Sequence, residues 1–129
     1  MDPVRDADVA LRRRVTQDDF DRFALLTGDD NPIHVDAAFA ARTRFGRTLA
    51  HGMMLYALVG ELVCGTLLPG AVEKEVRLVF PGPIFAGDEI VIAARIVAVA
   101  DGGIDVEAEA RRVADGGVGC ELRAFVTHG

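Results

Sequence analysis

The longest apolar stretch of the chain constrains its fold most strongly. It reads HGMMLYALVGELVCGTLLPG over residues 51–70, and Glu61 is the only charged residue between positions 53 and 68. A stretch of this length that is apolar on nearly all sides predicts a helix buried all round. Gly60 and Gly65 would each cost about 1 kcal/mol relative to alanine in an exposed helix, so we expect close packing against another backbone there. The Pro-Gly pair at its end predicts where the helix stops.

The second half of the chain has the pattern of strands. Apolar residues alternate with polar ones, or valine and isoleucine dominate, in segments 75–80, 89–99, 106–111 and 120–127. Turn-forming Gly, Asp and Pro separate these segments. The last three therefore predict an antiparallel meander, and residues 9–15 predict an opening strand. The whole pattern predicts an α+β fold in which an antiparallel sheet wraps around a long central helix. Because such a sheet has exposed edges, we expect two chains to pair as a dimer.

Length and composition limit the class of protein. The 129 residues, half of them hydrophobic, contain no linker, which predicts a single domain over residues 1–129. A net charge of -6 argues against nucleic acid or an anionic membrane as the main partner. The chain shows neither an apolar signal segment nor a membrane span, so we expect a cytoplasmic protein. Cys64 and Cys120 match no metal spacing and predict buried, reduced thiols, although a disulfide between them is possible.

Helix signals precede the most polar stretch of the chain. Thr16 predicts an N-cap, and Phe20 begins one apolar face that continues at positions 23, 24 and 27. Gly28 predicts the end of this helix. The next residues complete the string GDDNPIHVD, in which the proline disfavours helix at the residue before it. We therefore expect an ordered loop over residues 29–34, followed by a short helix over residues 37–42 that Asp36 caps.

Asp29 and His34 are the first candidate site residues. They stand five positions apart in a loop that Pro32 restricts, so both can point into one cavity. Histidine titrates near neutral pH, and a carboxylate supplies a base, which together suit general acid–base catalysis. Asn31 can close a turn that braces the loop. Taken alone, the stretch is more typical of a hydrogen-bonded polar turn at the surface.

A second candidate element, Ala50-His51-Gly52, lies directly before the apolar helix. A glycine at a helix N-terminus leaves a backbone N–H free, at the end where the helix dipole favours negative charge. Such a group can stabilise an oxyanion or enolate. In the alternative interpretation, Gly52 only lets the chain enter a crowded core, and His51 packs there or caps the helix.

Together these motifs resemble the MaoC-like dehydratase family, and within it the R-specific enoyl-CoA hydratases. The resemblance rests on GDDNPIHVD, on the later Phe-Ala and Phe-Gly pairs, on AHGM, and on VRLVFPGPIFAGDEI at residues 76–90. It implies a hot-dog fold, assembled as a dimer. It also implies reversible syn addition of water to a trans-2-enoyl thioester, which gives the (R)-3-hydroxyacyl thioester. We expect neither a cofactor nor a metal ion to be required.

The resemblance also implies a role for individual residues. The catalytic pair would be Asp29 and His34, and the N–H of Gly52 would bind the thioester carbonyl. Asn31 and His51 would support the pair. We expect residues of the apolar helix to contact the acyl group, namely Met53, Tyr56 and Val59. The arginines between the two motifs are candidates for the phosphates of coenzyme A, namely Arg42, Arg44 and Arg47.

Two further hypotheses fit the same sequence. A hot-dog thioesterase would use a carboxylate on the central helix, where Glu61 is the candidate. The chain could also be the active subunit of a heterodimeric 3-hydroxyacyl-acyl carrier protein dehydratase, so the acyl carrier is either coenzyme A or acyl carrier protein. Asp30 occupies the variable position of the family motif and adds a negative charge next to Asp29.

Overall fold

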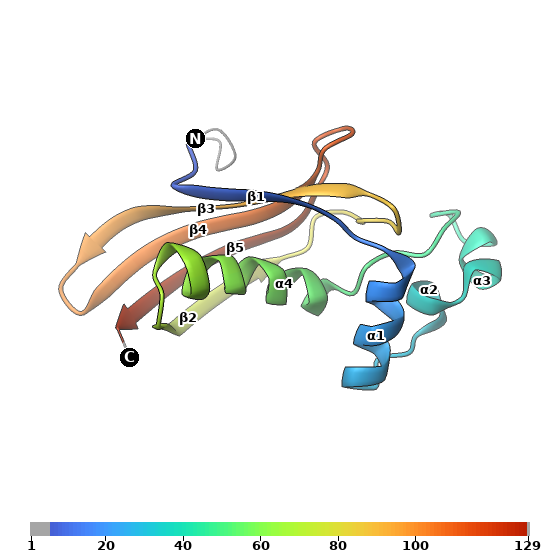
Figure 1. The fold of residues 1–129 in the computed structure, drawn as a ribbon, viewed down its shortest axis with the longest axis horizontal. Coiled ribbons are helices and arrows are strands. Elements are labelled where there is room, and N and C mark those ends of the chain that lie inside the picture. The colour runs from blue at the N-terminus through green and yellow to red at the C-terminus, as the bar shows by residue number, and fades with distance from the viewer. Residues whose placement is uncertain (1–5, 129) are drawn as a thin grey trace.

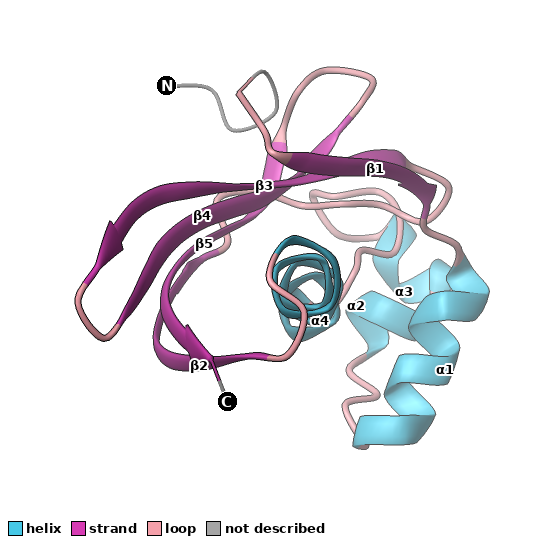
Figure 2. Ribbon diagram, turned by 60° about the vertical axis from the view of Figure 1, so that its left-hand side comes forward, coloured by secondary structure: helices cyan, strands magenta, loops and turns pink. Residues whose placement is uncertain are grey.

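A five-stranded antiparallel sheet curves around one central helix (Figures 1 and 2). The computed structural model describes residues 6–128. The strands are β1 (Val9–Arg14), β2 (Ala71–Val79), β3 (Glu89–Ala100), β4 (Gly103–Arg112) and β5 (Val118–His128). Their order in the sheet is β1-β3-β4-β5-β2, and each neighbouring pair is antiparallel. The predicted wrapped helix and the predicted meander of the last three strands are therefore confirmed.

The central helix begins as α4 (Gly52–Glu61) and continues as a π-helix, η1 (Leu62–Leu67). The side chains on one side of it are buried in the core, namely Met54, Leu55, Val59, Leu62 and Val63. The other side faces away from the sheet, and Met53 is 54% exposed there. The prediction of a helix buried all round is therefore wrong for this chain, because the sheet covers only one side.

The two glycines of this helix do not pack against another backbone. A Cβ at Gly60 would have the Tyr56 ring and the Glu73 carboxylate as its nearest neighbours, at 3.7 and 3.8 Å. A Cβ at Gly65 would instead meet the carboxylate of Glu61, which lies one turn earlier. The predicted close approach of backbones is therefore wrong at both positions.

The core between sheet and helix is aliphatic. The inward-facing side chains of three neighbouring strands are almost fully buried, namely Ile90, Ile92, Val106, Ala108, Leu122 and Val126. They alternate with outward-facing residues, as the pleat of a strand requires. Each such large aliphatic side chain contributes roughly 1.5–3 kcal/mol on burial. The sheet and α4 therefore form a rigid body on which the remaining helices are placed.

Three short helices lie together at the end of the sheet where α4 begins (Figure 1). They are α1 (Gln17–Thr27), α2 (Pro32–Val35) and α3 (Ala37–Ala41). Thr16 caps α1 in a reciprocal capping box with Asp19, and Gly28 ends it in the left-handed conformation, with φ 80°. Both predicted ends of α1 are confirmed, as is the cap of α3, where Asp36 accepts from the N–H of Phe39.

The predicted loop over residues 29–34 is only partly correct. A one-turn helix, α2, begins at Pro32 and includes His34. Proline excludes helix at the residue before it but suits the first helical position, where its fixed φ fits and its missing N–H is not needed. Asn31 caps α2 by accepting from the N–H of Ile33 at 3.1 Å. The proline therefore starts a helix here.

Both cysteines are free thiols, so the possible disulfide does not form. Cys120 is fully buried, whereas Cys64 is only half-buried. Burial raises the pKa of the Cys120 thiol to about 11. Among residues 6–128, no helix combines the length and the apolar character needed to cross a membrane.

Candidate active site

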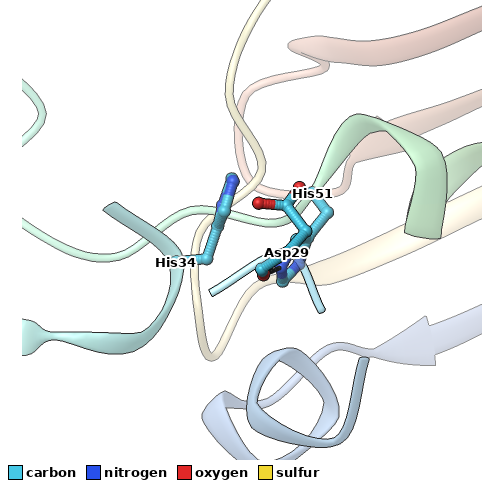
Figure 3. Close-up of side chains that lie close together, drawn as sticks. All are labelled: Asp29, His34 and His51. Atoms are coloured by element: carbon cyan, nitrogen blue, oxygen red, sulfur yellow. Dashed lines mark hydrogen bonds between the residues drawn. The ribbon is translucent and has the colours of Figure 1, made fainter. Parts of the chain in front are cut away.

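Three side chains from three segments meet beside the start of α4 (Figure 3). Asp29 lies between α1 and α2, His34 lies on α2, and His51 directly precedes α4. One nitrogen or carboxylate oxygen of each residue lies within 4.8 Å of those of the other two. The imidazoles of His34 and His51 stack, with ring centroids 3.9 Å apart and planes inclined by 23°. The two predicted catalytic residues and the predicted supporting histidine are therefore neighbours in space.

Hydrogen bonds to backbone carbonyls determine which nitrogen of each imidazole carries a proton. His34 Nδ1 lies 2.7 Å from the carbonyl oxygen of Leu49, and His51 Nε2 lies 2.8 Å from that of Asp29. A carbonyl oxygen only accepts, so each of these nitrogens donates. In the neutral imidazoles, the lone pairs therefore lie on His34 Nε2 and His51 Nδ1. His34 Nε2 can therefore accept a proton from water.

His51 belongs to the interior of the protein. It is 1% exposed, and the rings of Phe23 and Phe20 lie 4.8 and 6.5 Å from its ring. Burial lowers the pKa of His51, which keeps the ring neutral near pH 7. Its Nδ1 is buried without a hydrogen-bond partner among residues 6–128. The ring thus contacts the face of His34 and holds the backbone of Asp29, which supports the predicted supporting role.

The carboxylate of Asp29 stands at the surface of this cluster. Asp29 is exposed, and its backbone N–H donates to the hydroxyl of Thr27 at 3.3 Å. Asp30 is also exposed and lies outside the three-residue cluster. Its N–H donates to the carbonyl of Gly28 at 3.1 Å. Of the two adjacent aspartates, Asp29 is therefore the one that neighbours the histidines.

A pocket of about 390 Å³ adjoins His34 and the first residue of α4. Its lining includes Phe45, Gly52, Leu55, Phe80, Ile84 and Gly119. The first N–H groups of a helix have no partner within the helix, and the N-cap His51 supplies no side-chain cap in the part of the chain that the structure describes. The positive end of the α4 dipole therefore opens on this pocket at Gly52.

The Phe80 ring packs directly over Gly52. A Cβ at position 52 would lie 3.0–3.2 Å from three atoms of that ring. Glycine therefore lets the ring and the helix N-terminus approach each other closely. In this arrangement, an acyl carbonyl in the pocket could accept a hydrogen bond from the backbone.

The three clustered residues are also of types that bind zinc. An imidazole binds a metal ion through a lone pair that lies in the plane of its ring. The planes of His34 and His51 are nearly parallel and one ring thickness apart, so both lone pairs cannot converge on one ion. The stacked geometry therefore suits proton transfer better than metal binding.

A family model described as a MaoC-like domain matches residues 3–117. The chain belongs to the MaoC-like domain family. It is 40% identical over 88 residues to a 3-hydroxybutyryl-CoA dehydratase of Methylorubrum extorquens, a match that covers 67% of this chain and 55% of that protein. It is 41% identical over 81 residues to an (R)-specific enoyl-CoA hydratase of Aeromonas caviae, which covers 61% of this chain and 60% of that protein. The chain thus spans little more than half the length of these relatives.

The structural match covers more of both chains than the sequence matches do. The solved structure of an (R)-hydratase from A. caviae, described as involved in PHA biosynthesis, superimposes with a TM-score of 0.87. The match has 29% sequence identity and covers 94% of this chain and 93% of the other. The MaoC-like domain therefore has the hot-dog fold that its motifs predicted.

The three predicted substrate contacts lie outside the pocket lining of this MaoC-like domain. Met53 is exposed, and the hydroxyl of Tyr56 donates to Glu73 Oε1 at 2.7 Å. That hydrogen bond, together with burial, raises the pKa of Tyr56 to about 12. Val59 is fully buried in the core. Among the described residues, none of these three lines the pocket, and their role in acyl binding stays a prediction.

Of the three arginines predicted to bind phosphate, only Arg44 lines the pocket in the described chain. Its guanidinium carbon lies 4.6 Å from the centroid of the Phe45 ring. Arg47 lies over Phe85 instead, and Arg42 is exposed outside the pocket lining. Glu61, the carboxylate on which a thioesterase would depend, is also exposed and away from this pocket in the described chain.

Two residues of the pocket wall, Gly119 and Phe80, were not predicted from the sequence. Gly119 packs against Ile84 and Leu55, and a Cβ there would lie 2.8 Å from Ile84 Cδ1 and 3.2 Å from Leu55 Cδ1. A glycine inside an alternating strand pattern is a signal of close approach, and Gly119 stands at the start of β5. No comparable local signal marks Phe80 as a neighbour of Gly52.

Proposed function

We propose that this MaoC-like domain adds water reversibly to a trans-2-enoyl thioester and forms the (R)-3-hydroxyacyl thioester. One observation carries the proposal: His34 lines a pocket on which the helix N-terminus at Gly52 opens, and Asp29 lies outside the lining but within 4.8 Å of His34. The names of the Aeromonas and Methylorubrum relatives, an (R)-specific hydratase and a dehydratase, support the same chemistry.

The chemistry assigns a task to each group. The β-carbon of an enoyl thioester becomes electrophilic when its carbonyl is polarised, and the Gly52 N–H would stabilise the enolate that forms. A water held by Asp29 and His34 adds its oxygen to C3 as one O–H bond breaks. The released proton passes through the pair to C2, which completes the addition. The reverse sequence removes water from the 3-hydroxyacyl thioester.

The acyl group would be carried by coenzyme A or by acyl carrier protein, which share a phosphopantetheine arm. Arg44 supports this choice, because its guanidinium is exposed at the pocket and guanidinium groups bind phosphate well. Hydration rates with the same acyl group on coenzyme A and on acyl carrier protein would distinguish the two carriers.

We further propose that two chains pair in solution as a homodimer. Apolar residues are exposed on α4 and on strand β2 and its end, namely Met53, Val72, Val79 and Phe80. β2 forms one edge of the described sheet, and an unpaired edge is a template for pairing with a second chain. Sedimentation velocity on the purified chain should give twice the monomer mass. A monomer that gains mass and activity only when a second hot-dog protein is added would indicate the heterodimeric alternative.

The catalytic assignment is tested by two adjacent aspartates. Asp29→Asn removes the negative charge of one member of the proposed pair with little change in shape, and kcat for crotonyl-CoA hydration should fall by about 10²–10⁴-fold. Asp30→Asn makes the same change of charge one residue further along, outside the cluster, and should keep most of the activity. Equal activity of the two variants would refute the assignment of Asp29.

A further inference from the structure

The chain contains one glutamine and one asparagine, and the side-chain amides of both bind α2. Asn31 Oδ1 accepts from the N–H of Ile33 in the first half of α2. Gln17 Nε2 donates to the carbonyl oxygen of His34 at 2.8 Å in the second half. A helix of four residues cannot stabilise itself, because forming the first turn is unfavourable. The position of His34 therefore depends on bonds that come from outside α2.

The amide of Gln17 is fully engaged. Besides His34, its Nε2 donates to Asp21 Oδ1 at 3.0 Å, and its Oε1 accepts from the hydroxyl of Thr48 at 2.5 Å. Thr48 is 3% exposed, so this end of the contact lies in the interior. The opposite amide orientation would place Oε1 against two acceptors. The network therefore has one arrangement, with two donors and one acceptor satisfied.

Thr48 connects this amide to the group that orients the imidazole. The next residue, Leu49, accepts from His34 Nδ1 through its carbonyl and donates its N–H to the carbonyl of Ile33 at 3.1 Å. Gln17 thus holds the backbone of His34 on one side and the segment that fixes the His34 ring on the other. Its amide therefore bridges the two segments, beside the direct hydrogen bonds of Leu49.

We infer that Gln17 is a positioning residue for His34, an inference whose catalytic part rests on the proposed hydratase function. Gln17 lies outside the lining of the pocket, so it acts through His34 and not through the substrate. An imidazole that moves by about 1 Å can lose about 10²-fold in rate, since proton transfer requires near-ideal geometry. Loss of the Gln17 contact should therefore lower kcat and leave KM little changed.

Two substitutions remove the contact in different ways. Gln17→Glu keeps the shape but replaces the donor with an oxygen, which faces the carbonyl of His34 and the carboxylate of Asp21. Gln17→Met keeps the length and removes every polar atom. Arg22→Gln is the matched control, because it changes the net charge by the same amount on the same helix. The Arg22 side chain is 78% exposed and pairs with Asp18 on the surface.

Both Gln17 variants should lower kcat by about tenfold or more with KM within about twofold, whereas Arg22→Gln should match the wild type. A readout independent of activity is the ¹⁵N NMR spectrum of the His34 ring, whose Nδ1–H form should lose dominance in both variants. If kcat and this spectrum both stay at wild-type values, the inference is wrong.

The two hypotheses fail in distinguishable ways. A wild-type protein without hydratase activity would refute the proposed function, while the His34 spectrum would still decide whether Gln17 positions the ring. If Gln17→Glu does not fold, Gln17→Met decides the outcome. Thr48→Val gives an independent route, because it removes the hydroxyl that binds Gln17 Oε1 and should alter the His34 spectrum in the same direction.

Discussion

Gly119→Ala tests whether the wall of the pocket is packed as tightly as the structure indicates. The new Cβ would collide with Ile84 Cγ1, and it would lie 2.8 Å from Ile84 Cδ1 and 3.2 Å from Leu55 Cδ1. Carbon atoms in favourable contact are about 3.5–4.0 Å apart, so Ile84 would have to retreat by more than about 1 Å. Ile84 is itself almost fully buried, so it can retreat only toward the pocket that it lines, with loss of its present packing.

The expected loss of stability follows from two opposing effects. Overpacking of a core costs about 1–3 kcal/mol. Replacing glycine by alanine returns about 0.4–1 kcal/mol, because the unfolded chain loses freedom. The net expectation is a free energy of unfolding lower by about 1–2 kcal/mol, or a Tm lower by roughly 3–8 °C for a domain of this size.

Urea unfolding at one fixed protein concentration measures this change. Gly82→Ala is the control in the same pocket, because its Cβ would meet only the carbonyl oxygen of Val118, at an ordinary 3.4 Å, and it should be nearly neutral. Combining Gly119→Ala with Ile84→Ala should cost at least about 1 kcal/mol less than the two separate losses together, since the colliding atoms are gone. Equal stability of the Gly119→Ala and Gly82→Ala proteins would refute this account of the pocket.

Three further predictions concern the neighbourhood of the site and the core. His51→Phe keeps a stacked ring but loses the bond to the Asp29 carbonyl, so kcat should fall by about tenfold. Because burial lowers the pKa of His51 below its ordinary 6.5, the unfolded chain binds a proton that the folded chain does not. The free energy of unfolding of the wild type should therefore fall as the pH drops below 6.5, and it should fall less steeply in His51→Phe. Urea titrations over this pH range measure both, and an equal pH dependence in the two proteins would contradict the prediction. Iodoacetamide at pH near 8 should label Cys64 before Cys120, whose thiol should react only on unfolding, as mass spectrometry can follow. Gly52→Ala should fold normally, because the half-exposed Phe80 ring can turn outward. The added methyl group and the displaced ring would crowd the N–H of residue 52, so kcat/KM should fall by about tenfold or more.

Local signals in the sequence predicted the parts of the fold that local physics determines. Thr16 and Gly28 fix the ends of α1 through contacts within a few residues, and both were predicted correctly. The predicted loop over residues 29–34 was partly wrong, because a proline such as Pro32 can either break or begin a helix, and here the cap that Asn31 provides favours a helix. The strands and the meander of the last three were predictable from alternation and turn residues, but the places of β1 and β2 at the two edges required the structure.

The contacts that were not predictable join residues far apart in the chain. The approach of Phe80 to Gly52 and the bond from Gln17 to His34 have no local pattern, because each partner alone suits many environments. The burial of the central helix was overestimated for the same reason. An apolar sequence shows that a surface can be covered, but only the structure shows that the sheet covers one side of α4.

The most direct test of the central claim is the stereochemical outcome of one reaction. Purified protein is incubated with crotonyl-CoA, and the 3-hydroxybutyryl-CoA formed is resolved by chiral chromatography. The wild type should form the (R) product, and both Asp29→Asn and His34→Ala should lose it. Formation of the (S) product, release of free coenzyme A without hydration, or full activity in either variant would contradict the proposed function.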